Sequence, residues 1–214
     1  MKALTVQIRA LCILFAGMSL LAFGCSPLTP MGAAHLVRNP AADSPKGSVT
    51  SSVSLDYLED SGEFLAFQGS GAARFSLAEN YDLSAAVAKA GLLNGEGALD
   101  LSAGDFRLSF IHGLGFATRS EDDGDDRLNV YGAFAGFFGQ WNLDEKAALF
   151  FATRYGFLSA DNDTATTIGA SLGYAWWTTG GLQVAPELSF IQVQPDAGDS
   201  NILISPMLNF SAPF

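Results

Sequence analysis

The chain contains very little cysteine or histidine. Cys12 and Cys25 are its two cysteines, and His35 and His112 are its two histidines. If the first 24 residues are removed on export, Cys25 alone remains, and an internal disulfide is excluded. A metal site built from several Cys and His ligands is excluded as well, because such sites need three or four ligands at characteristic spacings. We therefore expect neither a metal nor a cofactor.

Positive charge and long apolar runs are also scarce. Eleven Lys and Arg stand against 22 Asp and Glu, which gives a formal net charge of −11. A strongly acidic chain binds nucleic acid poorly, because phosphates require the opposite charge. We therefore expect no nucleic-acid partner. After Cys25 no apolar run approaches the ~20 residues of a membrane helix, so a membrane span in that part of the chain would have to be made of strands.

The first 25 residues have the features of an export signal. Lys2 and Arg9 supply positive charge, residues 10–21 are almost entirely apolar, and Gly24 precedes Cys25. The sequence 21–25, Leu-Ala-Phe-Gly-Cys, resembles a lipobox, although alanine stands where a large aliphatic residue is usual. The resemblance implies that Cys25 is lipidated and that cleavage occurs before it. The alternative is an ordinary secretory signal with a chance cysteine.

Composition divides the chain into three parts. Residues 1–24 are the expected signal peptide, and residues 47–214 form one domain of alternating segments. Residues 25–46 lie between them, with four prolines and no periodicity, and we expect a flexible tether that follows the lipid anchor. His35 falls in this stretch, where a solvated imidazole is expected.

Period-two alternation recurs from residue 47 to the end of the chain. Ten segments are recognised, most with apolar residues on one face and small or polar residues on the other, which is typical of β-strands. The segment 82–91 is Ala-rich and weak, and 127–141 is ambiguous because both of its faces carry aromatics. Short turns alternate with longer polar loops between them, and an even strand number is typical of single-chain barrels. If the first segment is tether and the third and fourth are misread, the count falls to eight. The expected strands are 49–58, 63–77, 82–91, 97–103, 105–118, 127–141, 146–158, 166–177, 182–193 and 201–211.

The last segment carries the most specific pattern. Counting back by twos from Phe214 gives Ala212, Phe210, Leu208 and Pro206, a nearly continuous apolar face. A final strand with a terminal Phe resembles the assembly signal of small bacterial outer-membrane β-barrels, with Phe210 and Phe214 in the signal positions. The resemblance implies an antiparallel up-and-down transmembrane barrel in the cell outer membrane. Its implied partners are outer-membrane lipids and, during insertion, the barrel-assembly machinery; the oligomeric state stays open.

A water-soluble, lipid-tethered β-barrel is the alternative, with the apolar faces turned inward. The opposite faces of 146–158 and 166–177 favour the membrane barrel, because they hold Gly, Ala, Ser and Thr with one Arg. The solvent face of a soluble sheet usually carries more Lys, Glu and Gln.

On the membrane interpretation, several charged residues face the lumen. Because buried charges are costly unless they are paired, we expect a polar network that fills a narrow barrel and leaves no open diffusion channel. The possible pairs are Arg154 with Glu187, and Arg74 or Arg107 with Asp56 or Asp100, and the sequence does not choose among them. The expected network comprises Asp56, Arg74, Asp100, Arg107, Arg154 and Glu187.

Candidate catalytic chemistry is sparse. Alternation places His112 on the lipid side, and some outer-membrane lipid A deacylases carry an exterior His, but their His-x-Ser-Asn spacing is absent because Leu114 and Gly115 occupy those places. No set of nucleophile, base and orienting group is visible, so the sequence favours a non-enzymatic role. The acidic loop after residue 120 contains Asp122, Asp123, Asp125 and Asp126. It has the hard oxygen ligands of a divalent-ion site but not the spacing of a dedicated calcium loop; a solvated tip is the alternative.

The sequence therefore predicts an outer-membrane β-barrel lipoprotein with a structural or surface-interaction role and a lumen filled by side chains. A lipid-modifying enzyme, or a narrow channel or small-ligand-binding barrel, are the alternatives.

Overall fold

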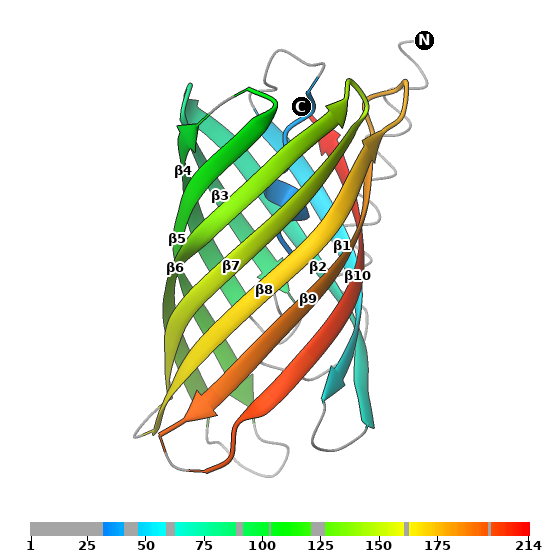
Figure 1. The fold of residues 1–214 in the computed structure, drawn as a ribbon. Coiled ribbons are helices and arrows are strands. Elements are labelled where there is room, and N and C mark those ends of the chain that lie inside the picture. The colour runs from blue at the N-terminus through cyan, green and yellow to red at the C-terminus, as the bar shows by residue number, and fades with distance from the viewer. Residues whose placement is uncertain are drawn as a thin grey trace.

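The computed structural model describes residues 32–40, 47–58, 63–88, 92–102, 104–120, 127–160, 163–196 and 198–214. The described chain forms ten strands, which wind into one closed barrel around a short helical turn (Figure 1). The turn is the 3-10 helix η1 (Ala34–Leu36). The strands are β1 (Gly47–Leu58), β2 (Glu63–Ala78), β3 (Tyr81–Ala88), β4 (Leu92–Ser102), β5 (Phe106–Ser120), β6 (Arg127–Asp144), β7 (Ala147–Ala160), β8 (Asp163–Trp177), β9 (Gln183–Pro195) and β10 (Asn201–Pro213).

Each strand pairs antiparallel with its sequence neighbours, and β1 pairs with β10 to close the ring. Val49 lies opposite Ala212 and Val53 opposite Leu208 at this closing seam. At the end of the seam, the N–H of Phe214 donates to the carbonyl of Gly47 over 3.1 Å. Closure removes both sheet edges, so every strand has partners on both sides. The expected ten-strand barrel is confirmed, and the eight-strand alternative is wrong because β1, β3 and β4 all pair fully.

The apolar faces point outward, as expected for a membrane barrel and opposite to a soluble one. Leu114 is 70% exposed and Leu172 is 63% exposed, whereas Ser109 and Ser205 on inward positions are fully buried. Trp141, Tyr155 and Tyr131 also lie on the outside. The inner wall consists mainly of Gly, Ala, Ser and charged residues. Among the described residues, no helix has both the length and the apolar character needed to cross a membrane.

The strand boundaries agree with the sequence prediction to within a few residues, and β4 is the largest exception. It begins at Leu92, five residues before the expected start, and pairs with β3 from Leu92 and with β5 from Leu93. The sequence Leu-Leu-Asn-Gly-Glu has no clear alternation, so its strand conformation depends on these neighbours. β6 likewise continues through Asn142 to Asp144, which were expected in the turn.

The expectation that the stretch before the barrel is solvated is wrong for the part that the structure describes. Ala33, Ala34 and Leu36 have no exposed surface, and His35 is 4% exposed. Figure 1 shows this segment, in blue, inside the ring of strands and toward the end where β10 finishes. Small side chains let it enter the lumen, and lumenal groups bind its backbone. The remainder of the expected tether, residues 25–31 and 41–46, lies outside the described residues.

Candidate functional site

The lumen at the end where β1 begins and β10 finishes is the candidate site, and we call this end the terminal mouth. Residues 32–40, which we call the plug, occupy it. The plug is folded by two internal hydrogen bonds, from the N–H of Leu36 to the carbonyl of Ala33 (2.9 Å) and from that of Val37 to Ala34 (3.3 Å). Such a single 3-10 turn is compact, and the Gly-Ala-Ala sequence keeps its first half narrow enough to fit between the walls.

Glu187 of β9 holds the start of the plug. Its carboxylate accepts hydrogen bonds from the backbone N–H groups of Ala33 (2.6 Å) and Ala34 (3.2 Å). The amide of Asn209, on β10, donates to the same carboxylate over 3.3 Å. Glu187 is only 4% exposed. A buried carboxylate needs several donors to offset its desolvation, and here the backbone of the plug supplies two of them.

Arg38 fixes the other end of the plug. Its guanidinium forms ion pairs of 2.9 Å with Asp82 of β3 and with Asp100 of β4. Gln140 of β6 binds the backbone of the same residue twice: it accepts from the Arg38 N–H (2.9 Å) and donates to the Arg38 carbonyl (2.7 Å). One plug residue is therefore held by three strands through directional contacts, which sets its register in the mouth.

Two further arginines bind the middle of the plug. The carbonyl of Leu36 accepts hydrogen bonds from Arg107 of β5 (2.7 Å) and from Arg74 of β2 (3.5 Å). Arg107 also pairs with Asp100 over 2.8 Å, as one of the predicted alternatives had it. Arg74 instead pairs with Asp82 over 3.6 Å. Because β2, β5, β6 and β9 all contact the plug, it lies within the barrel and not against one side of it.

Asp82 and Glu96 are the two carboxylates of the site that sequence reasoning missed, together with Arg38, Gln140 and Asn209. Asp82 lies within ion-pair distance of Arg38, Arg74 and Arg107, and accepts a hydrogen bond from Ser76 over 2.7 Å. Glu96 pairs with Arg154 over 3.1 Å. Both residues lie on the two Ala- and Gly-rich strands whose alternation is weakest. The two carboxylates were detectable only as acidic residues in segments otherwise made of small side chains.

His35 lies beside the second of these pairs. Its Nδ1 donates to the carbonyl of Gly32 over 2.8 Å, and its Nε2 lies 3.8 Å from the Glu96 carboxylate. Burial lowers the pKa of this imidazole, and the nearby Glu96 opposes that shift without cancelling it. The lowered pKa favours the neutral imidazole, and the hydrogen bond to Gly32 assigns its proton to Nδ1.

Apolar packing completes the contact between plug and wall. Leu36 and Val37 belong to one buried cluster with Ile111, Phe138 and Phe150 of the wall. The rings of Phe138 and Phe150 lie 6.4 Å apart, and the guanidinium of Arg107 lies 5.5 Å from the Phe138 centroid. The sequence left the inward face of β6 undecided because both of its faces carry aromatics; the structure turns Phe138 inward and Phe137 outward.

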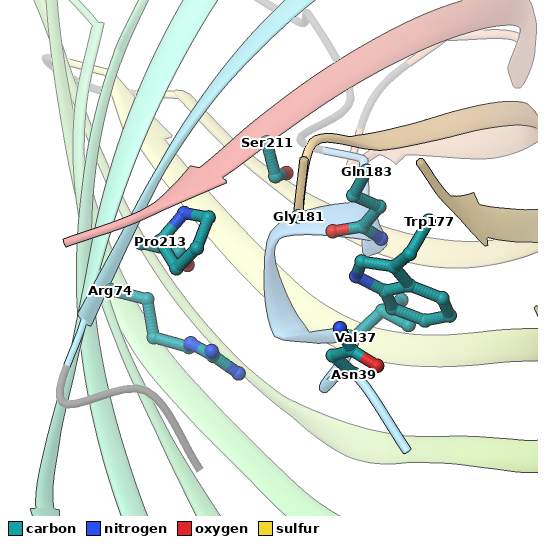
Figure 2. A pocket seen from close by; sticks show the side chains of 9 residues that line it. Val37, Asn39, Arg74, Trp177, Gly181, Gln183, Ser211 and Pro213 are labelled. Carbon is teal, nitrogen blue, oxygen red and sulfur yellow. The ribbon is translucent and has the colours of Figure 1, made fainter. Parts of the chain in front are cut away.

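A pocket lies between the plug and the wall. It has a volume of about 130 Å³ and opens at the terminal mouth (Figure 2). Figure 2 shows the Arg74 side chain reaching from β2 toward Val37 and Asn39 of the plug. Trp177 and Gln183 line the opposite side. The plug therefore forms one side of this pocket and the barrel wall forms the other.

The other predicted site residues have separate positions. Asp56 lies inside the barrel near the far end of β1, where it accepts a hydrogen bond from Ser205 over 2.6 Å. It has no ion-pair partner among the described residues, so it does not join the arginine network. Phe214 packs edge-on against Phe75 on the outer surface, with the ring centroids 5.5 Å apart. Phe210 lies on the same outward face, opposite Val184 of β9. Cys25 and the acidic residues Asp122, Asp123, Asp125 and Asp126 lie outside the described residues.

His112 lies on the outer surface, as alternation predicts. It stacks on Phe110 and on Tyr81, and the Tyr81 hydroxyl lies 3.4 Å from its Nε2. The described residues also contain no cluster of three or more His, Cys, Asp or Glu side chains that would hold a metal ion.

Comparisons with known proteins give similarities of fold at low sequence identity. No family model and no curated protein matches the sequence. The chain is similar to the outer membrane protease OmpT from Escherichia coli, at 11% identity and a TM-score of 0.49, over 79% of this chain and 94% of that one. It is similar to Neisserial surface protein A at 7% identity and a TM-score of 0.41, over 78% and 96%. Ail, the attachment invasion locus protein of Yersinia pestis, gives 9% identity and a TM-score of 0.38, over 79% and 99%.

Proposed function

We propose that this chain is an outer-membrane β-barrel lipoprotein with a sealed lumen and a structural or surface-interaction role. The observation that carries the proposal is the combination of an apolar outer wall with a lumen closed by the chain's own residues. The apolar wall supports membrane insertion, and the occupied lumen argues against a permanently open pore.

The outer wall supports a hydrocarbon environment on physical grounds. Soluble monomers rarely expose contiguous apolar patches larger than a few hundred Å², whereas here apolar side chains surround the barrel on every strand. Leu77, Leu93 and Leu101 are each more than half exposed, and so are Phe157 and Ile168 on the opposite strands. In a membrane these groups contact lipid tails, and the closed ladder satisfies the strand backbone.

The position of the plug is compatible with a lipid anchor at Cys25. Six residues lie between Cys25 and Gly32 in the sequence, so the anchor lies within about 25 Å of Gly32 at full extension. Gly32 lies inside the lumen beside Glu187 and Met207, and this length of chain is enough to leave the lumen and to bring an acyl chain to the surrounding leaflet. Barrel and anchor therefore fit one membrane, with Phe214 at the same end for recognition by assembly machinery.

The test uses the full chain expressed in a Gram-negative host. We expect the mature protein in the outer-membrane fraction, a lipid-modified Cys25 by mass spectrometry, and a faster-migrating band when the gel sample is not boiled. Reconstituted in planar bilayers, the wild type should pass no steady current. A Cys25→Ala variant controls for the anchor: it should lose the lipid but keep the heat-modifiable barrel.

Two outcomes contradict the proposal. If the Cys25→Ala protein leaves the envelope in detergent-free buffer, the barrel is a soluble one. A steady current through the wild type would favour the channel alternative.

A lipid-modifying activity is the second candidate, favoured by the stacked His112 and Tyr81 on the lipid-facing wall. Their aromatic and hydroxyl groups meet the membrane where acyl chains pass. Mass spectrometry of lipid A and phospholipids from cells expressing wild type or His112→Ala tests it. A modification that appears with the wild type and disappears with the variant would establish catalysis; identical lipids in both would remove this candidate.

A further inference from the structure

The plug is attached to the barrel by contacts that differ in kind from those that hold the barrel together. Within the described residues, its hydrogen bonds to the wall run between plug backbone and wall side chains, or between side chains. None of the ten strand pairings includes plug residues, and the ring closes through β1 and β10 alone. The plug can therefore leave without breaking a single ladder hydrogen bond of the wall.

The wall behind the plug is built to keep large side chains away from the axis. Phe134 lies with its ring directly over Gly113, and Phe150 lies over Gly173 of the neighbouring strand. Any side chain on either glycine would meet the ring, so both aromatics lie flat along the wall because of the missing Cβ atoms. Small residues occupy several other inward positions, beside the larger Leu203 and Met207 of β10; the small ones include Gly132, Gly136, Gly156, Gly169, Ser189 and Ser205.

The mouth gains a net negative charge when the plug leaves. With the plug in place, four arginines face four carboxylates: Arg38, Arg74, Arg107 and Arg154 against Asp82, Asp100, Glu96 and Glu187. Arg38 belongs to the plug and departs with it. Three arginines then face four carboxylates, and Glu187 loses the two N–H groups that it binds. A narrow opening ringed by excess carboxylate favours cations over anions.

We propose that the barrel is a gated conduit for small cations, closed by residues 32–40 and opened when Arg38 leaves Asp82 and Asp100. The inference rests on the proposed membrane barrel, and it adds an activity that the closed form does not display. The solute class follows from the residual charge of the mouth and from its width, since a ten-strand barrel is only slightly wider than one that side chains fill.

The experiment compares three reconstituted proteins in planar bilayers under a KCl gradient. Deletion of residues 32–40 should give steady current, with K⁺ more permeant than Cl⁻ by roughly two-fold or more, because the mouth carries excess carboxylate. Arg38→Glu, which sets like charges against Asp82 and Asp100, should give intermittent openings of the same selectivity. Lys146→Glu is the matched charge reversal, in an exposed turn outside the lumen, and should stay closed like the wild type.

A further variant tests the selectivity argument. Glu187→Gln in the deletion background makes three arginines face three carboxylates, so the permeability ratio should move toward one while the current persists. An unchanged ratio would overturn the assignment of selectivity to this mouth.

Heat-modifiable migration separates folding from gating. A folded but silent deletion variant, together with a silent Arg38→Glu, overturns the proposal. Loss of the folded barrel in both variants overturns the proposal too, because the proposal requires the ten-strand barrel to remain folded when the plug is absent. If the deletion alone fails to fold, Arg38→Glu decides. A steady current through the wild type is a different result: it contradicts the sealed lumen of the proposed function.

Discussion

Asp82 shows how much of this lumen depends on one side chain. Three guanidinium groups converge on its carboxylate, which has no exposed surface. Arg38 comes from the plug, Arg74 from β2 and Arg107 from β5, so one carboxylate joins three segments that are distant in sequence. Buried ion pairs contribute modestly when complete, but the loss of one partner is costly, because the remaining charge stays desolvated.

Replacement of Asp82 by Asn tests this dependence. The amide keeps the shape but removes the negative charge, so we expect the free energy of unfolding to fall by about 3 kcal/mol, within the range for a broken buried pair. Guanidinium titration of the detergent-solubilised protein, followed by tryptophan fluorescence, measures it. Asp105→Asn, in an exposed turn, is the matched control and should change stability by less than about 0.5 kcal/mol. Equal midpoints for the two variants would show that the network is not stabilising.

The conformation of the plug is set by its contacts with the wall and not by a pattern in its own sequence. Residues 32–40 have no periodicity, and their 3-10 turn is held by two backbone hydrogen bonds and by one from the His35 side chain to Gly32. A segment this short has little helical stability of its own. Its conformation depends on Glu187, Gln140 and the arginines of the wall, which bind its backbone groups at the correct places.

Docking of the plug should weaken in acid because of His35. Burial lowers the pKa of this imidazole in the docked state, so the undocked state, with an ordinary value of about 6.5, takes up a proton more readily. The contribution of the neutral His35 to docking of the plug is therefore complete above the pKa of the undocked imidazole, and it is lost progressively as the pH falls below that pKa. Glu96, Arg154 and Arg74 are the charged groups around the ring. The wild type should stay closed at pH 7.5 and should show channel openings that become more frequent as the pH falls to 5, whereas His35→Gln should show a flatter profile. Openings that become rarer in acid would contradict the predicted weakening of plug docking.

At the scale of the whole molecule, the barrel depends on closure more than on a core. Most of its large apolar residues face outward, and the lumen combines one apolar cluster with charged groups, so the hydrophobic collapse that stabilises soluble domains contributes less inside. The continuous antiparallel ladder satisfies every strand on both sides. In lipid an unpaired strand edge costs several kcal/mol for each exposed backbone group, and closure is therefore the decisive term.

Two deletions of similar size should then differ sharply. Removal of residues 201–214 leaves nine strands, of which β1 and β9 run in the same direction and cannot close an antiparallel ring. We expect no heat-modifiable band and little protein in the outer membrane. Removal of residues 32–40 leaves the ring complete and should preserve the band. Gel migration of unboiled samples compares the two variants at matched expression. A compact nine-strand species would show that the β1–β10 pairing is not required for a closed barrel.

The sequence by itself determined the strands, their outward faces and most of the lumenal charges. Period-two alternation is a local property, and it placed Arg74, Arg107 and Glu187 inside and Leu114 and Phe157 outside without knowledge of any partner. The even strand number likewise follows from counting the alternating segments along the chain.

The tertiary structure alone decided which groups meet. The partners Asp82 and Glu96, the inward ring of Phe138 and the position of the plug all depend on which strands face each other across the lumen. That arrangement is set by strand order and closure, since residues far apart in sequence meet only when the ring has formed. From the sequence, His35 is a solvated residue in a proline-rich stretch. It is buried in the structure because the barrel surrounds it, with Glu187 bound to Ala33 and Ala34 and Asp82 bound to Arg38.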